Sequence, residues 1–169
     1  MKLTLWQQLD ILARQITPFI LTLAVMIAAM VPLQLPNFAQ VMPWLALAAV
    51  YYWSVHRPDL MPAVAVFAVG VFHDLAAGTV LGVGAAALVL VHAAVLSQRR
   101  FFMSRSFLVI WLGFVVIAAG AILLAWLLNA ALLGALIDPR PALFQFLTTI
   151  AVYPLVGWLF AQVQRSVLR

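Results

Sequence analysis

Between Arg105 and Asp138 the chain has no charged side chain, and residues 107–137 are almost entirely apolar. At 1.5 Å per residue, a helix over this stretch would be about 46 Å long, whereas the hydrocarbon core of a bilayer is about 30 Å thick. The stretch therefore predicts a helix that crosses a membrane. A span of this length must tilt strongly, break near Gly120 or Asn129, or protrude from the bilayer.

The rest of the chain has the same character, since 67% of its residues are hydrophobic and 8% are charged. A soluble domain of this size could not cover so much apolar surface, so the chain is expected to be an integral membrane protein. The absence of cysteine excludes a disulfide framework and thiolate ligation of a metal. The formal charge of +5 indicates basic membrane loops. It does not indicate nucleic-acid binding, because no basic patch is interleaved with polar side chains.

Prolines and polar turns divide the apolar sequence into six predicted transmembrane helices within a single transmembrane domain, 1–169. The fold class expected is therefore an all-α integral membrane protein. Residues 1–16 form an amphipathic lead-in at the cytoplasmic interface. The spans are expected at residues 17–35, 41–55, 60–77, 79–97, 106–137 and 142–163. At the end of the second span, Tyr51, Tyr52 and Trp53 are expected to form an interfacial aromatic belt.

The basic residues predict the orientation of these spans. Six spans place both termini on one side of the membrane, and only Arg140 then lies on the other side. The side of the termini carries the remaining basic residues, which are Lys2, Arg14, Arg57, Arg99, Arg100, Arg105, Arg165 and Arg169. This bias predicts that both termini are cytoplasmic.

Asp74 is the only acidic residue that hydropathy places at membrane depth, and it recurs at four-residue spacing with Gly70, Gly78 and Gly82. If the segment is one helix these residues share a face; if the chain turns, Gly78 is the natural hinge. An ionisable group in hydrocarbon costs several kcal/mol by most estimates, so it needs a partner or a role. Two interpretations follow: Asp74 binds or couples a ligand, or it caps free N–H groups at the start of the fourth span.

The surroundings of Asp74 can also be predicted. The third and fourth spans are expected to join almost without a loop, with Gly78 and Gly82 where their backbones approach closely. A large side chain at either glycine would then separate the two spans. Polar side chains at comparable depth are the expected hydrogen-bond partners of Asp74, namely Asn129, Gln145, Thr148 and Thr149.

Other residues that could carry chemistry give weaker patterns. His73 points about 100° away from Asp74 on a helix, and it differs in depth from His92 by about 10 Å, so a shared metal is not expected. No histidine and carboxylate are expected to converge on any serine, and the serines are placed at the interfaces: Ser54, Ser97, Ser104, Ser106 and Ser166. No catalytic residue, metal site or cofactor is therefore predicted.

Three places along the sequence form a recognisable pattern. They are an aromatic-then-proline turn, a central G-x3-D-L-x2-G-x2-L-G signature, and a proline in the last span that precedes a basic tail. The residues are Tyr52, Trp53 and Pro58; Gly70, Asp74, Leu75, Gly78, Leu81 and Gly82; and Pro154. With its length and six-span layout, the chain resembles the MreD family, the rod shape-determining membrane proteins of bacteria. The long fifth span with Asn129 and the absence of Glu are not part of the resemblance.

The resemblance implies a non-enzymatic role in the complex that builds the lateral cell wall, at the bacterial inner membrane. Its implied partners are the periplasmic scaffold MreC and, through it, the cytoskeletal protein MreB, the glycosyltransferase RodA and its partner transpeptidase, besides membrane lipid. The family is also similar in fold to the substrate-binding S components of energy-coupling-factor vitamin transporters. The alternative function is therefore a small-molecule binding component with a pocket at the outer face near Asp74.

Overall fold

The computed structural model describes residues 17–28, 42–102 and 106–167, and within these ranges the chain is all-helical. Its helices are Thr17–Ala28, α2 (Leu45–His56), the 3-10 turn η2 (Pro58–Leu60), α3 (Ala63–Ala77), α4 (Val83–Phe102), α5 (Phe107–Leu133) and α6 (Arg140–Val167). The predicted lead-in at 1–16 and residues 29–35 of the first predicted span lie outside the described residues.

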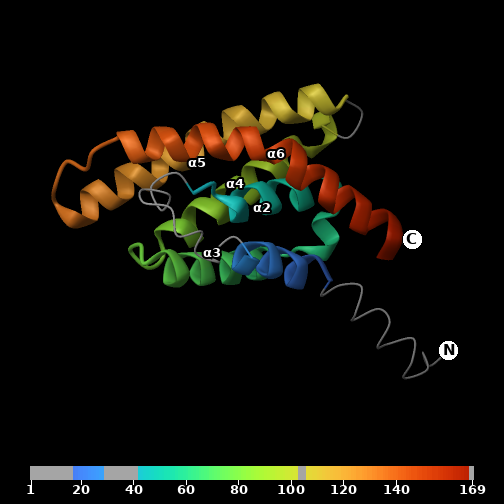
Figure 1. The fold of residues 1–169 in the computed structure, drawn as a ribbon, viewed down its shortest axis with the longest axis horizontal. Coiled ribbons are helices and arrows are strands. Elements are labelled where there is room, and N and C mark those ends of the chain that lie inside the picture. The colour runs from blue at the N-terminus through green and yellow to red at the C-terminus, as the bar shows by residue number, and fades with distance from the viewer. Residues whose placement is uncertain (1–16, 29–41, 103–105, 168–169) are drawn as a thin grey trace, which may run out of the picture.

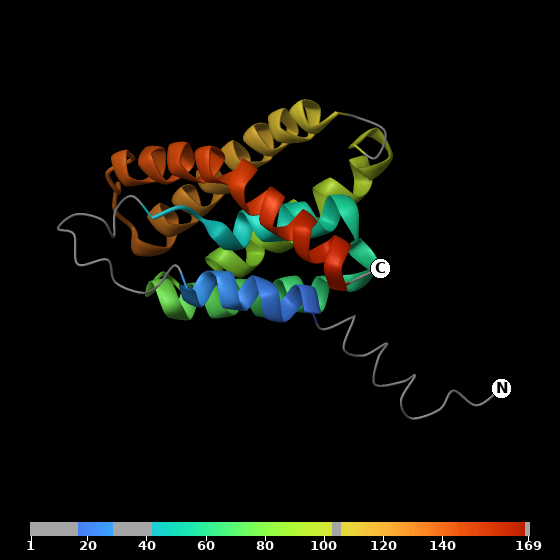
Figure 2. The same cartoon turned by 45° about the vertical axis from the view of Figure 1, so that its right-hand side comes forward.

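The helices are arranged in three layers. In Figures 1 and 2, α5 and α6 run side by side along one side of the molecule, and α3 and the helix Thr17–Ala28 lie on the opposite side. Helices α2 and α4 lie between them, and α2 contacts α3, α4, α5 and α6. The α3–α4 and α5–α6 connections lie at one end of the molecule, and the α2–α3 turn and the C-terminal end of α6 lie at the other end.

Helix α2 is the centre of the core, because every residue from Ala46 to Val55 is buried. Its sequence is apolar around the whole circumference, which is typical of a helix surrounded by others. Small side chains at Ala46, Ala48 and Ala49 let neighbouring helices approach closely, as at helix interfaces in membranes. The residues that position the rest of the bundle are therefore on a helix of only 12 residues.

The predicted aromatic belt is wrong, because Tyr51, Tyr52 and Trp53 lie in this core. The hydroxyl of Tyr51 donates to the carbonyl oxygen of Ile110 at 2.8 Å, and the hydroxyl of Tyr52 donates to Oε1 of Gln164 at 3.0 Å. Buried tyrosines need such partners. Here α5 and α6 supply them, so these rings hold three helices together.

The helices at the central hairpin differ from the predicted spans. A loop over residues 78–82 separates α3 from α4, so α4 begins four residues later than predicted and extends to Phe102. Gly78 is the left-handed C-cap of α3, with φ 65°, as expected for a hinge. A second positive φ, 96° at Gly82, makes the connection longer than the predicted reversal.

Helix α5 is continuous from Phe107 to Leu133, so the break considered near Gly120 or Asn129 is absent. The Asn129 side-chain amide donates to the carbonyl oxygen of Ala125, one turn earlier, at 2.8 Å. This bond satisfies the polar group without breaking the helix. The helix ends before residue 137 because Gly134 forms a left-handed C-cap.

Among the described residues, α5 and the stretch Arg140–Ser166 of α6 are long and apolar enough to cross a membrane. Only 22% and 28% of their most apolar windows are buried inside the molecule. Most of this apolar surface therefore faces outward, as expected for helices surrounded by lipid.

Candidate functional site: the Asp74 turn

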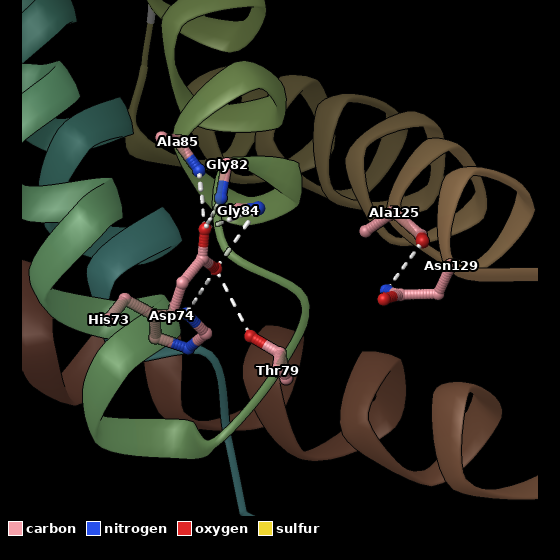
Figure 3. A network of polar contacts seen from close by, with 8 residues as sticks. All are labelled: His73, Asp74, Thr79, Gly82, Gly84, Ala85, Ala125 and Asn129. Atoms are coloured by element: carbon pink, nitrogen blue, oxygen red, sulfur yellow. Dashed lines mark hydrogen bonds and ion pairs between the residues drawn. The ribbon is translucent and has the colours of Figure 1, made fainter. Parts of the chain in front are cut away.

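The candidate site is built from the end of α3, the loop over residues 78–82 and the first turn of α4. The backbone N–H groups of Gly78 and Thr79 both donate to the carbonyl oxygen of Asp74, which closes the C-terminus of α3. The chain then reverses, so that the N-terminus of α4 faces the Asp74 side chain (Figure 3). Local backbone bonding thus places a carboxylate at the start of the next helix.

The Asp74 carboxylate accepts hydrogen bonds from four donors of this turn. Oδ2 accepts from the backbone N–H groups of Gly82 at 2.8 Å, Gly84 at 3.1 Å and Ala85 at 3.3 Å. Oδ1 accepts from Gly84 N–H at 3.0 Å and from the Thr79 hydroxyl at 3.2 Å (Figure 3). The side chain is 1% exposed. The capping contacts that the sequence predicts for Asp74 are therefore present.

This cap has an unusual origin. The Gly82 carbonyl oxygen accepts the first bond of α4, from Ala86 N–H, so Gly82 is the N-cap residue and has no side chain to cap with. An N-cap side chain normally satisfies the N–H groups at the second and third helical positions. In α4 these are Gly84 and Ala85, and Asp74 of the preceding helix satisfies both. The negative charge also lies at the positive end of the α4 dipole.

Close packing occurs at Gly70 and Gly84, which corrects the prediction for Gly78 and Gly82. A Cβ added at Gly84 would collide with Oδ1 of Asp74, and one added at Gly70 would collide with the backbone of Ala85. At Gly78 and Gly82, a Cβ would meet no atom within 4 Å. Those two positions need glycine for their positive φ, whereas Gly70 and Gly84 need it for space.

The donors to the Asp74 carboxylate within the described residues include none of the four side chains predicted as its partners, so that prediction is wrong. The Thr149 hydroxyl donates to the backbone carbonyl oxygen of Gln145 and accepts from the backbone N–H of Trp44 at 2.9 Å. The Thr148 hydroxyl donates to backbone carbonyl oxygens of α6. Asn129 points toward its own helix in Figure 3. The loop backbone and Thr79 occupy the acceptor sites of the carboxylate instead, because they belong to the same turn as Asp74.

His73 lies nearer to Asp74 than their predicted 100° separation suggests. Its Nδ1 is 3.6 Å from Oδ1 of Asp74, which is too long for a hydrogen bond, and its ring packs 5.3 Å from that of Trp44. Both Nδ1 of His73 and Nε1 of Trp44 are buried without a partner among the described residues. The site therefore combines a saturated carboxylate with a sparsely bonded aromatic pair.

Residues 10–165 match the model of a protein family described as rod shape-determining protein MreD. The chain belongs to the MreD family. This is a family of membrane proteins that determine rod cell shape, and it is not a known enzyme family. A search of curated proteins and a search of solved structures each gave no match.

The residues that carried the resemblance to MreD separate into two groups in space. Gly70, Asp74, Gly78 and Gly82 build the turn described above, and the intervening Leu75 and Leu81 expose their side chains on its outside. The second group lies outside this turn: Tyr52 bonds to α6, Trp53 packs against Phe160 of α6, and Pro154 lies inside α6, whereas Pro58 begins η2 directly after α2.

One polar pair was missed by the sequence reasoning. Ser54 is fully buried, and its Oγ lies 2.7 Å from Nδ1 of His92 and 2.6 Å from the carbonyl oxygen of Val50. Since a carbonyl only accepts, the hydroxyl donates to Val50 and accepts from Nδ1–H of His92. The serine proton thus points away from the histidine, which is the opposite of an activated nucleophile. Ser54 and His92 are 38 residues apart, so no local pattern in the sequence could have paired them.

No group of three or more His, Cys, Asp or Glu side chains close enough to hold a metal ion lies within the described ranges.

Proposed function

We propose that this chain is a non-enzymatic, multi-pass component of the lateral wall elongation complex in the bacterial inner membrane. In this role it associates with MreC and, through MreC, with MreB, RodA and the partner transpeptidase. Membership of the MreD family supports the role in rod shape. The observation that carries the non-enzymatic reading is the saturation of Asp74, the one carboxylate at the centre of the chain, by donors of its own turn.

The geometry of the turn gives Asp74 a structural task. A carboxylate has about four lone-pair sites, and four donors of the turn already occupy them. A ligand could bind there only by displacing N–H groups that have no other partner, at about 1–3 kcal/mol each. Asp74 therefore fixes the angle between α3 and α4, and this rigid hairpin is what a partner in the membrane would recognise.

The alternative, a binding component similar in fold to the S components of vitamin transporters, needs an outer-face pocket near Asp74. Such a site would require side chains that remain free to bond a polar ligand. The carboxylate is 1% exposed and engaged, and Thr148, Thr149 and Asn129 bond within the protein. These contacts favour the assembly role over the transporter role.

The proposed orientation has cytoplasmic N- and C-termini. The Arg99 side chain donates to the carbonyl oxygen of Val55 at 3.3 Å, so the end of α4 lies beside the end of α2. Arg57 and Arg165 occupy the ends of α2 and α6 at this same end of the molecule, whereas Arg140 begins α6 at the other end. This grouping of basic residues supports a cytoplasmic basic end.

Co-purification tests the proposal. A tagged copy of the chain, extracted in mild detergent from cells that depend on it for rod shape, should bring down MreC. A copy with Gly70→Leu, which drives α3 and α4 apart, should lose both MreC and rescue of rod shape, while Gly120→Leu should keep both. If rod shape is rescued without MreC being recovered from crosslinked membranes, the proposed association is wrong. If a small polar molecule copurifies in stoichiometric amount instead, the transporter alternative holds.

A further inference from the structure

A groove of about 770 Å³ lies between α2, α5 and α6 at the basic end of the molecule, away from the Asp74 turn. Its volume falls within the range of about 300–1,000 Å³ that is typical of ligand sites. Each of the three helices contributes to its lining, and the residues that matter below are Tyr52, Phe107, Gly157, Trp158, Gln164 and Arg165.

The groove is deepest against α6 at Gly157, which has no side chain to fill the space. A Cβ added at Gly157 would meet no atom within 4 Å, although the residue itself is buried. Pro154, three residues earlier and therefore on the same face of α6, also lines the groove. A single large side chain at Gly157 would consequently fill the space without moving any neighbouring helix.

One end of the groove presents positive charge and hydrogen-bond donors. The Tyr52 hydroxyl donates to Oε1 of Gln164, and the NH₂ group of that amide bonds to none of the residues that the structure describes, so it can donate to an occupant. The next residue, Arg165, is exposed and makes no ion pair with any residue that the structure describes. An amide donor and an uncompensated guanidinium at one place match the phosphate group of a lipid.

The rest of the groove is lined by apolar side chains and is open to the outside of the molecule. Phe107 and Trp158 are 56% and 64% exposed, so the mouth of the groove faces the same surroundings as the outer faces of α5 and α6. In a membrane protein those surroundings are lipid tails. An occupant must therefore combine a hydrocarbon part along Gly157 with an anionic part at Arg165.

We propose that this groove holds one anionic phospholipid, with its phosphate at Arg165 and Gln164 and an acyl chain along Gly157 and Trp158. The arrangement joins a basic headgroup site to a lipid-facing apolar channel, which is the pattern of specific lipid recognition at the basic face of membrane proteins. This goes beyond the proposed role in wall elongation and does not depend on it.

Tryptophan quenching by brominated lipids tests the proposal directly, because Trp158 lines the mouth. The full chain is reconstituted in phosphatidylcholine vesicles, and dibrominated phosphatidylglycerol or dibrominated phosphatidylcholine is added in increasing mole fraction. We expect a saturable quenching component at low phosphatidylglycerol content. Arg165→Gln should raise the phosphatidylglycerol fraction at half-quenching about five-fold, the effect of one basic side chain at an anionic surface. Arg140→Gln, at the opposite end, is the matched charge control and should leave it unchanged.

Gly157→Leu tests the channel itself. It should abolish the saturable component seen with phosphatidylglycerol, whereas Gly120→Leu, which also adds a side chain in open space on a lipid-exposed helix, should not. Thermal unfolding in the same vesicles checks that both variants are folded. Saturable quenching that survives Gly157→Leu, or equal response to the two lipids in the wild type, overturns the proposal. The proposal is also overturned if Gly157→Leu leaves quenching intact and instead abolishes recovery of MreC, because the groove would then hold a protein partner.

Discussion

The indole Nε1 of Trp111 in α5 donates to the backbone carbonyl oxygen of Ile150 in α6 at 3.1 Å. In a regular helix the N–H group of residue 154 would bond to this oxygen, but residue 154 is Pro154, which has no N–H. A side chain from the neighbouring helix thus replaces the missing helical bond, as lipid-surrounded helices require.

Removal of the Trp111 donor should destabilise the protein more when residue 154 is Pro than when it is Ala. In the wild type, Trp111→Phe leaves the Ile150 oxygen unpaired, at about 1–3 kcal/mol. In a Pro154→Ala background a backbone N–H can bond to the same oxygen, so the same substitution should cost less. Thermal unfolding of the four variants in detergent gives the coupling free energy, in which the packing loss common to both backgrounds cancels. An equal loss in both backgrounds would contradict the replacement of one donor by the other.

Substitution of Asp74 should give a graded result. Asp74→Asn can keep an oxygen toward Gly82, Gly84 and Ala85 while its NH₂ group donates to the Thr79 hydroxyl, which can accept. Asp74→Ala leaves the backbone donors unpaired, at about 1–3 kcal/mol for each buried group. We therefore expect normal membrane abundance and rescue of rod shape with Asn, and low abundance with Ala. Full abundance of Asp74→Asn without rescue would instead show that the charge itself is functional.

Gly84→Ala should destabilise the hairpin although the change adds one methyl group. The new Cβ would collide with the Asp74 carboxylate, and such overpacking costs about 1–3 kcal/mol. Gly120→Ala, with no atom within 4 Å of its Cβ, should be neutral or stabilising by up to about 1 kcal/mol. Unfolding temperatures of the two variants provide the comparison. The steric account fails if Gly84→Ala unfolds at the wild-type temperature.

At Gly78 the order of two substitutions separates strain from crowding. The residue has φ 65° and open space around it, so Gly78→Asn should cost less than Gly78→Ala, because Asn tolerates the left-handed region better. We expect a loss of about 1–2 kcal/mol for Ala. Crowding predicts the reverse order, since Asn is larger. Stability measurements on the two purified variants decide between these causes.

Single cysteines test the orientation, because the chain contains none. Leu136, in the α5–α6 connection, is 95% exposed and should be labelled as Leu136→Cys by a membrane-impermeant thiol reagent in intact cells. Ser166→Cys, near the end of α6, should react only after permeabilisation. Labelling of Ser166→Cys in intact cells would place the basic end outside and contradict the six-span topology.

Several features of the turn could be predicted because they depend on residues close together in the sequence. Asp74 is followed by glycines and a helix start, and an acidic side chain beside free N–H groups needs no distant partner to make a cap. Gly78 was identified as the hinge for the same local reason. The hydrogen-bond partners predicted for Asp74 in α5 and α6 were wrong, since residue type and depth alone do not determine which donors lie within bonding distance of a carboxylate.

By itself, then, the sequence determined the helical class and the MreD family, and it named Gly78 as the hinge of a turn and a cap as one of two roles for Asp74, because composition and short-range spacing carry these properties. The tertiary structure alone decided that α2 is the buried centre, that Gly70 and Gly84 mark the close approaches, and that Trp111 completes α6. The physical reason is clearest in α2 and α5, which are apolar on every face. Without an amphipathic pattern, the buried face is fixed only by the shapes of the helices that meet it.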